Sequence, residues 1–370
     1  MRIFVVIGTR PEAIKMLPLV IELRKNVKNE VVVCHSGQHR ELAEEVFDCF
    51  GVSPDLRCDC KAQGLTEMTN KYLEYFDMIF KEKAPDIVLV HGDTATAFCA
   101  SLAAFYNRIL IAHIEAGLRT FDKDSPFPEE VYRVGIDAMA DLHFAPTPLA
   151  AHHLSNEGGK RAFVVGNTGL DALKYTLKEN YVNSDLCDNN GKKPVLITCH
   201  RRENIGTRME NALLGIKDYL STREDVMAIV SVHPNPAVRR IVESVFSDVK
   251  NIKICKPLKV QDFHNILSRC LFVVTDSGGI QEEATYLGIP VFLLRDKTER
   301  QEGVALGNVK IIGTDREGVA KALKSITSDK ESFECMSVPS HIFGDGRASE
   351  RIADILSSSD FQKTLAKSRI

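Results

Sequence analysis

Three stretches of the sequence place acidic side chains where a predicted apolar segment ends. Asp93 lies in HGDT after DIVLVHG (86–92), and Glu115 lies at the end of ILIAHIE (109–115). Glu129 follows two prolines in SPFPEE. Like charges that share a buried site raise a pKa and so supply a proton donor or acceptor. An Asp such as Asp93 is more often a helix N-cap than a catalyst, but three acidic clusters together favour acid–base chemistry on a neutral, hydroxyl-rich substrate.

Cationic side chains accompany a second group of predicted strand ends. GTRPEAIK places Arg10 and Lys15 at the start of a helix whose backbone amides can also hold a phosphate. The alternative is a capped helix with two surface cations. CHRREN places His200 near Arg202, which suits a dianionic group, although a basic surface turn is the alternative. VHPNP adds His233, for which a structural role is the stronger interpretation.

The stretch DSGGIQEE (276–283) combines residues that suit a phosphate with residues that would repel one. Ser277 and the two glycines after it can present a hydroxyl and bare amides to a phosphate at a helix N-terminus. The two glutamates that end in Glu283 would repel a phosphate in contact with them. A nucleoside diphosphate satisfies both halves if its phosphates meet the loop and its ribose hydroxyls meet a carboxylate. Arg300, after the next strand end, is expected to line the same site.

Short β-branched runs alternate with helix-length segments along the chain. Continuous apolar strands separated by helices indicate parallel sheets that are covered on both faces. About six strands in each half favour an α/β protein of two doubly wound domains over one eight-stranded barrel. The expected strands are 2–8, 30–34, 86–92, 109–115, 142–147 and 162–167 in the first half, and 194–200, 226–233, 251–255, 271–277, 290–294 and 309–313 in the second.

The polar, Asn/Asp-rich stretch 179–194 is the best boundary between the two domains. We therefore expect an N-terminal domain over residues 1–178 and a C-terminal domain over 179–347. The last segment, 348–370, begins with a helical period, and we expect it to return to the first domain as a helix. Ligands of such domains bind beyond the carboxyl ends of the strands, which is where the polar motifs occur.

The composition of the chain argues against several classes of protein. At 370 residues, with 44% hydrophobic and 26% charged residues, it is typical of a soluble globular protein. A net charge of −3 and the lack of tryptophan argue against nucleic acid or an anionic membrane as a partner. No run is long enough for a membrane span, and the first apolar run is too short for a signal peptide. The ten cysteines show no metal-ligand series, so we expect a reduced, cytoplasmic protein without a metal.

The motifs follow one another in an order that resembles the UDP-N-acetylglucosamine (UDP-GlcNAc) 2-epimerase family, of the non-hydrolysing bacterial and archaeal type. GTRPEAIK, HGDTATA, IEAGLRT, SPFPEE, HRREN, VHPNP, SGGIQEEA and TERQEG cover nearly the whole chain in that order. The resemblance implies two Rossmann-like domains facing a cleft, as in B-type glycosyltransferases, and a homodimer. It also implies interconversion of UDP-GlcNAc and UDP-N-acetylmannosamine (UDP-ManNAc) by elimination and re-addition of UDP, without NAD, a metal or another cofactor.

The same resemblance implies roles for individual residues. The family's acid–base positions match Asp93, Glu115 and Glu129. His200, together with Arg10, matches positions that stabilise the departing diphosphate. Positions that hold UDP or the substrate match Arg10, Lys15, Arg202, His233, Phe263 (near the uracil), Ser277, Gly278, Gly279, Glu283 (on the ribose) and Arg300.

Two features of the sequence bear on differences within the family. Many members bind a second UDP-GlcNAc as an activator, and Gln38, His39 and Gln63 match that second site. An arginine that often accompanies them is Ala62 here, which argues against activator dependence. The pattern PEE-x-NR reads PEEVYR, so Tyr132 replaces an asparagine close to a predicted proton carrier, with a consequence for substrate preference.

Four other activities remain open at this point. A hydrolysing relative would release UDP and free N-acetylmannosamine. An epimerase of a modified UDP-amino sugar would need an extra basic residue near carbon 2 if the sugar carried a carboxylate. A B-type glycosyltransferase would consume its donor only when an acceptor is present. A non-catalytic nucleotide-sugar sensor would not need three carboxylates.

Overall fold

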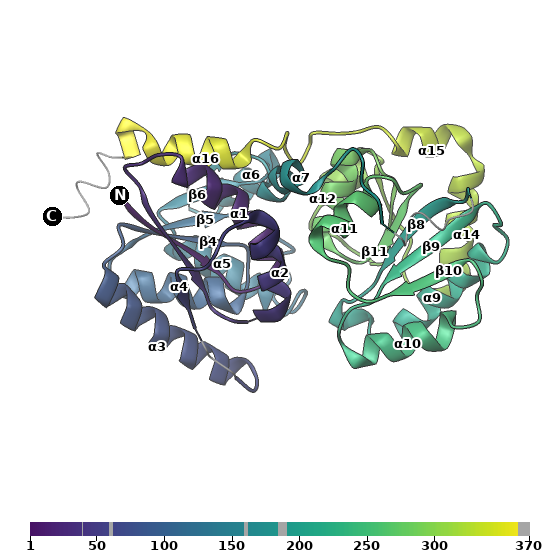
Figure 1. Cartoon of the computed structure of the whole chain (residues 1–370), viewed down its shortest axis with the longest axis horizontal. Coiled ribbons are helices and arrows are strands. Elements are labelled where there is room, and N and C mark those ends of the chain that lie inside the picture. Colours follow the sequence, from purple (N-terminus) through teal and green to yellow (C-terminus); the bar gives the residue numbers. More distant parts are fainter. Residues whose placement is uncertain (39, 59–61, 159–161, 184–190, 362–370) are drawn as a thin grey trace. The chain divides into compact units, whose positions relative to one another are not determined.

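The computed structural model describes residues 1–38, 40–58, 62–158, 162–183 and 191–361, and the chain forms two compact units (Figure 1). Unit 1 comprises Met1–Tyr175 and a returning segment that starts at Phe343, whereas unit 2 comprises Thr176–Ile342. The chain leaves unit 1 after Tyr175 and returns to it at Phe343. The bounds expected from the sequence, after residue 178 and after residue 347, lie a few residues further along the chain. The Asn167 N–H donates to the Phe343 carbonyl at 2.7 Å, so the returning segment joins unit 1 at Phe343.

Unit 1 is built on a parallel sheet of seven strands in the order β3-β2-β1-β4-β5-β6-β7. The strands are β1 (Arg2–Ile7), β2 (Glu30–His35), β3 (Leu56–Arg57), β4 (Ile87–His91), β5 (Leu110–Ile114), β6 (Leu142–Ala145) and β7 (Ala162–Val164). The six expected runs all form strands, because unbroken runs of Val, Ile and Leu are buried on both faces of a parallel sheet. The edge strand β3 was not expected, since two residues show no recognisable pattern.

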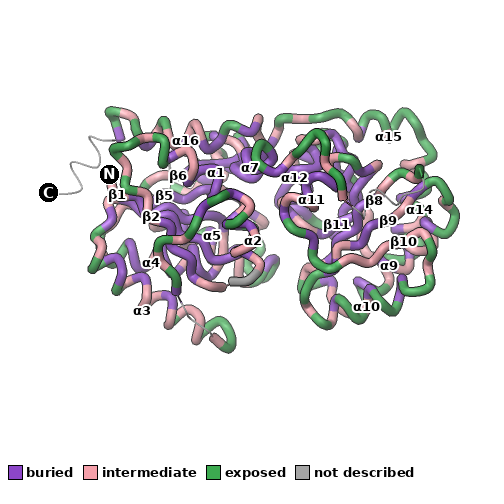
Figure 2. Tube along the Cα trace, in the orientation of Figure 1, coloured by how far each residue is buried: buried purple, intermediate pink, exposed green. Residues whose placement is uncertain are grey.

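Helices cover both faces of this sheet, and its central strands β1, β4, β5 and β6 are largely buried (Figure 2). Aromatic residues on one face of the sheet form a large part of the core. Phe4 of β1 packs on Phe80 of α3 (Leu65–Lys83), with ring centroids 5.9 Å apart. Phe76 stacks on Phe80 from the preceding turn. The helices are α1 (Arg10–Arg24), α2 (Arg40–Phe50), α3 (Leu65–Lys83), α4 (Ala95–Tyr106), α5 (Glu129–Met139), α6 (Pro148–Asn156), α7 (Thr168–Thr176) and α16 (Ala348–Ser357).

The returning helix α16 packs on α1 of unit 1. The carboxylate of Asp171 caps its N-terminus by accepting hydrogen bonds from the N–H groups of Ala348 and Ser349, at 3.2 and 2.8 Å. Residues 362–370 of the expected terminal helix lie outside the described residues. The described part of α16 is therefore tied to unit 1 through a buried carboxylate.

Unit 2 is built on a six-stranded parallel sheet in the order β10-β9-β8-β11-β12-β13. The strands are β8 (Lys193–Thr198), β9 (Val226–Ser231), β10 (Ile252–Cys255), β11 (Val273–Thr275), β12 (Val291–Leu293) and β13 (Val309–Ile311). The helical elements are η1 (Arg202–Asn204), α9 (Thr207–Leu220), α10 (Pro236–Phe246), α11 (Val260–Leu267), α12 (Gly278–Leu287), α13 (Gln301–Ala305), α14 (Arg316–Ser328) and α15 (Lys330–Met336). All six strands expected in this half of the sequence are present.

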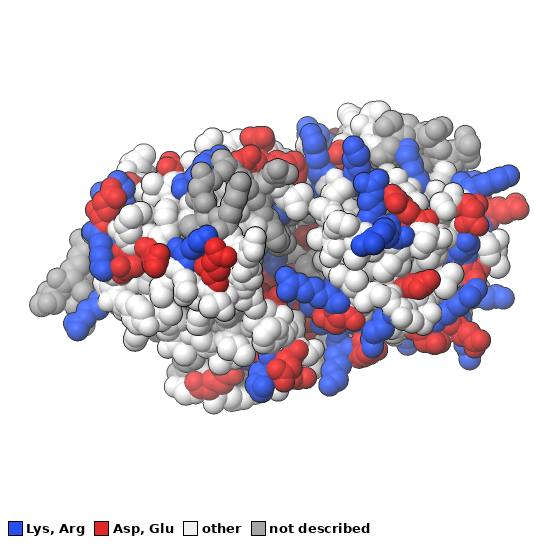
Figure 3. All heavy atoms as spheres, turned by 90° about the horizontal axis from the view of Figure 1, so that it is seen from below, with Lys and Arg blue, Asp and Glu red and all other residues white. Residues whose placement is uncertain are grey.

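The strand order reverses once in each sheet, between β1 and β4 in unit 1 and between β8 and β11 in unit 2. Ligands of doubly wound sheets bind at the carboxyl ends of the strands beside such a reversal. The expected α/β fold with two Rossmann-like sheets is confirmed. None of the helices in the described part of the chain combines the length and hydropathy needed to cross a membrane. Positive and negative side chains are interspersed over the face shown in Figure 3.

Candidate active site

Glu12 joins the helix N-termini that follow the two central strands of unit 1. It accepts hydrogen bonds from the Thr9 N–H at 2.6 Å and from the Thr94 hydroxyl at 2.7 Å. Thr9 and Thr94 are the N-caps of α1 and α4. One buried carboxylate therefore holds the residues next to both caps, Arg10 and Asp93. Glu12 was not predicted from the sequence, although the spacing Thr-x-x-Glu is that of a capping box.

Burial raises the pKa of Glu12 to about 7, although the hydrogen bonds from Thr94 and Thr9 act to lower it. The folded state then binds a proton more tightly than the unfolded state, so ionisation of Glu12 lowers stability. We expect its contribution to the free energy of unfolding to fall as the pH rises from 4.5 to about 7, and then to level off.

Glu12→Gln should therefore be progressively less destabilising, relative to the unchanged protein, as the pH rises through this window. Urea unfolding of both proteins across the pH range measures the difference directly. Glu74→Gln, at an exposed position of α3, is the matched control and should give a difference that does not change with pH. A pH-independent difference for Glu12→Gln would contradict the expectation.

Glu115 follows β5 and is paired from two sides. Lys15 of α1 forms an ion pair with its carboxylate, and His91 Nε2 lies 3.3 Å from Glu115 Oε2. The Glu115 backbone has a φ of 66°, in the left-handed region that non-glycine residues rarely adopt and that recurs at functional sites. Burial lowers the pKa of His91, although Glu115 acts to raise it. The arrangement places a carboxylate beside an ammonium group and an imidazole, which suits proton transfer.

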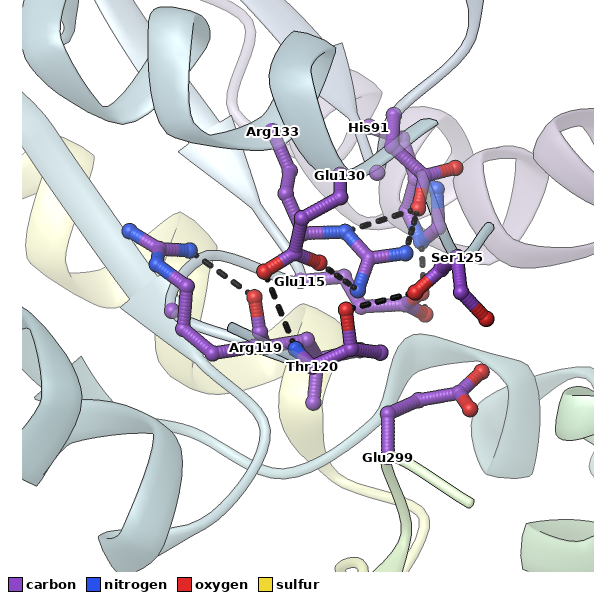
Figure 4. A network of polar contacts seen from close by, with 12 residues as sticks. His91, Glu115, Arg119, Thr120, Ser125, Glu130, Arg133 and Glu299 are labelled. Atoms are coloured by element: carbon purple, nitrogen blue, oxygen red, sulfur yellow. Dashed lines mark hydrogen bonds and ion pairs between the residues drawn. The ribbon is translucent and has the colours of Figure 1, made fainter. Parts of the chain in front are cut away.

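Asp93 follows β4 and is paired with Arg133 of α5. Figure 4 shows Arg133 turned toward Glu130 as well. Arg133 Nε donates to Asp93 Oδ2 at 3.0 Å, and its Nη1 donates to Glu130 at 3.0 Å. Glu130 also accepts from the N–H groups of Thr120 and Phe121, both at 3.0 Å. The side chain of Asp93 is 26% exposed and that of Glu130 is 5% exposed. Glu130 therefore anchors the loop at Thr120 and Phe121, whereas the side chain of Asp93 is partly exposed to solvent.

The N-cap of α4 is Thr94, so the alternative interpretation of Asp93 as a capping residue is wrong. Glu129 is the first residue of α5 and is half-buried.

Tyr132, the departure from the family pattern, stacks on Phe98 of α4 with ring centroids 5.0 Å apart and an angle of 22° between the rings. The Tyr132 ring thus contributes to the packing of α5 on α4.

A buried cluster fixes the two turns that follow β4 and β5. His113 lies 2.6 Å from Asp137 through Nδ1 and 2.7 Å from the Gly92 carbonyl oxygen through Nε2. Asp137 also pairs with Arg119 at 2.7 Å and accepts from the Gly117 N–H at 3.2 Å. Burial raises the pKa of Asp137, but His113 and Arg119 outweigh it and lower that pKa to about 2. The cluster, which sequence analysis missed, holds the turns that carry two predicted proton carriers.

In unit 2, Asp276 organises the loop that follows β8. Asp276 is fully buried after β11, and it accepts from the N–H groups of His200 and Arg201 at 3.0 and 2.9 Å. It also accepts from Asn204 Nδ2 at 3.0 Å and from Cys199 Sγ at 3.1 Å. The two strand ends beside the reversal of this sheet are therefore joined through one carboxylate. Nothing in the sequence indicated these partners, which are remote along the chain.

The two histidine motifs of unit 2 come together at the ends of β8 and β9. The rings of His200 and His233 stack with centroids 5.5 Å apart and an angle of 15°. His200 Nδ1 lies 3.6 Å from Asp276 Oδ1, and the His200 side chain is 37% exposed. Arg202 is exposed at the start of η1. His200 is therefore supported on two sides and still accessible to a ligand.

The N-terminus of α12 begins at Gly278, and Ser277 is its N-cap without a side-chain hydrogen bond to the helix. A Cβ at Gly279 would meet no atom within 4 Å, so the backbone there is open. A Cβ at Gly278 would lie 2.7 Å from Nη1 of Arg300, so only glycine lets that guanidinium lie against the helix start. The serine hydroxyl and the backbone at Gly279 are thus not used by the helix itself, and anion binding here stays a prediction.

The first of the two glutamates of α12, Glu282, belongs to a cluster of buried ion pairs. Arg300 Nε donates to Glu282 Oε1 at 2.8 Å, and Arg300 also pairs with Glu299. Arg295 and Arg201 lie 2.9 and 3.4 Å from the same Glu299 carboxylate. Burial raises the pKa of Glu299, but Arg300, Arg295 and Arg201 hold it well below its usual range. Glu282 is thus neutralised, and Arg300 is itself buried between two carboxylates.

Glu283, the second of these glutamates, is placed differently. Its carboxylate lies 3.5 Å from Nε2 of the buried His264 of α11 and keeps 11% of its side-chain surface exposed. Phe263 is the neighbouring residue on α11 and packs at the edge of the unit 2 core. The residues expected near a ribose and a base therefore come from adjacent helical segments.

Residues 21–357 of the chain match the family model described as UDP-N-acetylglucosamine 2-epimerase. The chain belongs to the UDP-N-acetylglucosamine 2-epimerase family. The Bacillus subtilis (strain 168) protein of that name is 46% identical over 360 residues, which cover 96% of this chain and 95% of the relative. The family expected from the order of the motifs is confirmed.

Similar solved structures agree with this membership. Staphylococcus aureus MnaA, solved with UDP, is 44% identical with a TM-score of 0.93, and 96% of each chain is covered. The Neisseria meningitidis UDP-GlcNAc 2-epimerase, solved with UDP-GlcNAc bound, is 36% identical with a TM-score of 0.93, covering 96% of this chain and all of that one. The spinosyn rhamnosyltransferase SpnG, at 14% identity and a TM-score of 0.58, shares the fold alone.

The residues that match the activator site of some epimerases fall in unit 1. Gln38 accepts a hydrogen bond from the Thr96 hydroxyl at 2.8 Å, just beyond β2. Gln63 is exposed, and its N–H donates to Glu67 at 2.7 Å near the start of α3. His39 lies outside the described residues. Over the described ranges, no group of three or more His, Cys, Asp and Glu side chains has the arrangement of a metal site.

Proposed function

We propose that this protein interconverts UDP-GlcNAc and UDP-ManNAc by elimination and re-addition of UDP. The observation that carries the proposal is the pair of carboxylates beyond the adjacent strands β4 and β5, each held by a cation. Arg133 holds Asp93, and Lys15 holds Glu115. Carboxylates held in this way keep a fixed position and orientation, as proton carriers require.

In the proposed reaction, a base removes the proton from carbon 2 of the sugar as the bond between carbon 1 and the UDP oxygen breaks. The electron pair of the carbon–hydrogen bond forms the double bond of a glycal, and UDP leaves with the electrons of its own bond. Proton delivery to the opposite face of carbon 2 and re-addition of UDP to carbon 1 give the epimer. Two faces require two carriers, and Asp93, Glu115 and Glu129 are the candidates.

Unit 2 is proposed to hold the nucleotide. The N-terminus of α12, from Ser277 to Gly279, provides a hydroxyl and backbone amides for the diphosphate. Glu283 would accept hydrogen bonds from the ribose hydroxyls. His200, whose backbone is fixed by Asp276, would stabilise the negative charge on UDP as it departs.

Proton NMR of the purified protein with UDP-GlcNAc in heavy water tests the proposal. We expect deuterium at carbon 2 of the sugar, together with the formation of UDP-ManNAc. No exchange and no UDP release by a folded protein would exclude this substrate. The same spectra separate the alternatives, because a hydrolysing enzyme would accumulate free N-acetylmannosamine and UDP irreversibly.

We also propose a homodimer that forms through unit 1. An apolar face on α4 and its neighbours α3 and α5 supports the proposal: Phe105 and Tyr106 are 56% and 63% exposed. Met78, Val131 and Val134 are further exposed apolar residues of these three helices. Exposed apolar surfaces of this kind mark protein interfaces.

The double substitution Phe105→Glu and Tyr106→Glu is expected to convert the dimer to a monomer, because four carboxylates would meet across a symmetric apolar contact. Light scattering coupled to size-exclusion chromatography gives the mass directly. Val27→Glu, at a position of unit 1 that is 95% exposed, is the control and should leave the mass unchanged. A dimeric mass for the double variant would place the interface elsewhere.

A further inference from the structure

The glutamate that we propose for the ribose is supported by a buried side chain with no role so far. His264 is 1% exposed and lies between Glu283 and Thr176. Its Nε2 is 3.5 Å from Glu283 Oε2, and its Nδ1 is 2.7 Å from the Thr176 hydroxyl oxygen. We infer that His264, held by Thr176, is a positioning residue that orients the Glu283 carboxylate toward the ribose hydroxyls of a uridine nucleotide. The inference rests on the proposed function.

The chemistry of the groups decides the direction of the hydrogen bond with Thr176 and which atom carries the proton in the contact with Glu283. An ionised carboxylate only accepts, so the ring nitrogen that faces Glu283 must carry a proton. In the neutral ring, the other nitrogen of His264 is then an acceptor and takes the hydroxyl proton of Thr176. A partner on the far nitrogen in this way fixes both the tautomer and the orientation of the ring. The 3.5 Å between His264 Nε2 and Glu283 Oε2 is long for a hydrogen bond, and such distances at functional sites often shorten when a ligand binds.

The chain segment that carries Thr176 is fixed to α11 by further hydrogen bonds. Asn265 Nδ2 donates to the Thr176 carbonyl at 2.7 Å, and Asn265 Oδ1 accepts from the Lys178 N–H at 3.0 Å. Thr176 and His264 are both buried, so neither side chain has room to turn. The ring of His264 is therefore fixed in position, whereas the side chain of Glu283 on α12 remains partly exposed to solvent.

Isothermal titration of the full-length protein with UDP and with 2′,3′-dideoxy-UDP tests the inference, because the second nucleotide lacks both ribose hydroxyls. His264→Phe keeps the ring volume and removes both nitrogens. We expect it to weaken UDP binding about tenfold, the range of a hydrogen bond to a charged group, and to leave dideoxy-UDP binding unchanged. His264→Gln, whose amide can take the place of Nε2, should restore most of the UDP affinity, whereas His264→Asn should not.

A matched pair of threonine variants tests the other end of the arrangement. Thr176→Val removes the hydroxyl that faces His264, and it should weaken UDP but not dideoxy-UDP. Thr285→Val removes a buried hydroxyl of α12 that has no hydrogen-bond partner among the described residues, and it should change neither affinity. An effect of Thr285→Val as large as that of Thr176→Val would overturn the inference.

The outcomes separate this inference from the proposed function. Equal weakening of both nucleotides by His264→Phe, or no weakening, would overturn the positioning role. Glu283→Gln tests the proposed placement of UDP independently, since it should weaken UDP much more than dideoxy-UDP. If Glu283→Gln does not discriminate, the placement fails and the inference fails with it. If Glu283→Gln discriminates and His264→Phe does not, only the inference fails.

Discussion

Asp93→Asn is expected to slow the incorporation of solvent deuterium at sugar carbon 2 by about 10² to 10⁴-fold, the contribution of a positioned acid or base. An amide cannot carry the proton, yet its oxygen can still accept the hydrogen bond that Arg133 Nε donates at 3.0 Å. The pairing of α5 with the end of β4 should therefore persist. UDP binding, which we assign to unit 2, should stay close to that of the unchanged protein.

The same substitution at the other end of β4 is the matched control. Asp86 precedes this strand and accepts a hydrogen bond from the Arg2 N–H at 2.7 Å. Asp86→Asn should leave deuterium exchange unchanged, because Asp86 lies away from the carboxyl ends of the strands. Loss of UDP binding in Asp93→Asn would make Asp93 a structural residue, and full exchange activity would remove it from the set of proton carriers.

Asp276→Ala is expected to lower the free energy of unfolding of unit 2 by about 3 kcal/mol, since it leaves several buried donors without an acceptor. The N–H groups of His200 and Arg201 and the amide of Asn204 all donate to this carboxylate. The loop after β8 should then lose its fixed conformation, and UDP affinity should fall as well. Urea unfolding measures the stability, and hydrogen exchange of residues 199–204 measures the local effect.

An acidic residue on the surface of the same unit is the comparison for this variant. Asp218 pairs with Arg316 at 2.6 Å, and its side chain is 41% exposed. Asp218→Ala should have only a small effect, because exposed ion pairs contribute little to stability. Unchanged exchange of the 199–204 amides in Asp276→Ala would show that other contacts hold this loop.

The strands and their polar ends could be predicted from the sequence, because a parallel sheet covered by helices requires unbroken apolar runs that stop where the chain turns. The motifs with Asp93, Glu115 and Ser277 were recognised in this way. The edge strand β3 was missed because two residues carry no pattern. Glu12 was missed although its spacing from Thr9 is a local signal. Its second partner, Thr94, is the N-cap of another helix, and no local pattern shows that contact.

The sequence by itself determined the fold class, the family and part of the set of side chains at the carboxyl ends of the strands. Only the tertiary structure decided which of these side chains meet. Arg133 with Asp93, Asp276 with the loop 199–204, and His264 with Glu283 all join residues that are distant along the chain. The physical reason is that hydrophobic periodicity reports burial within one element, whereas the neighbours of a buried charge depend on strand order and helix packing. DSGGIQEE shows the difference: its residue types suggested a nucleotide, but only the fold paired Glu282 with Arg300 and left Glu283 beside His264.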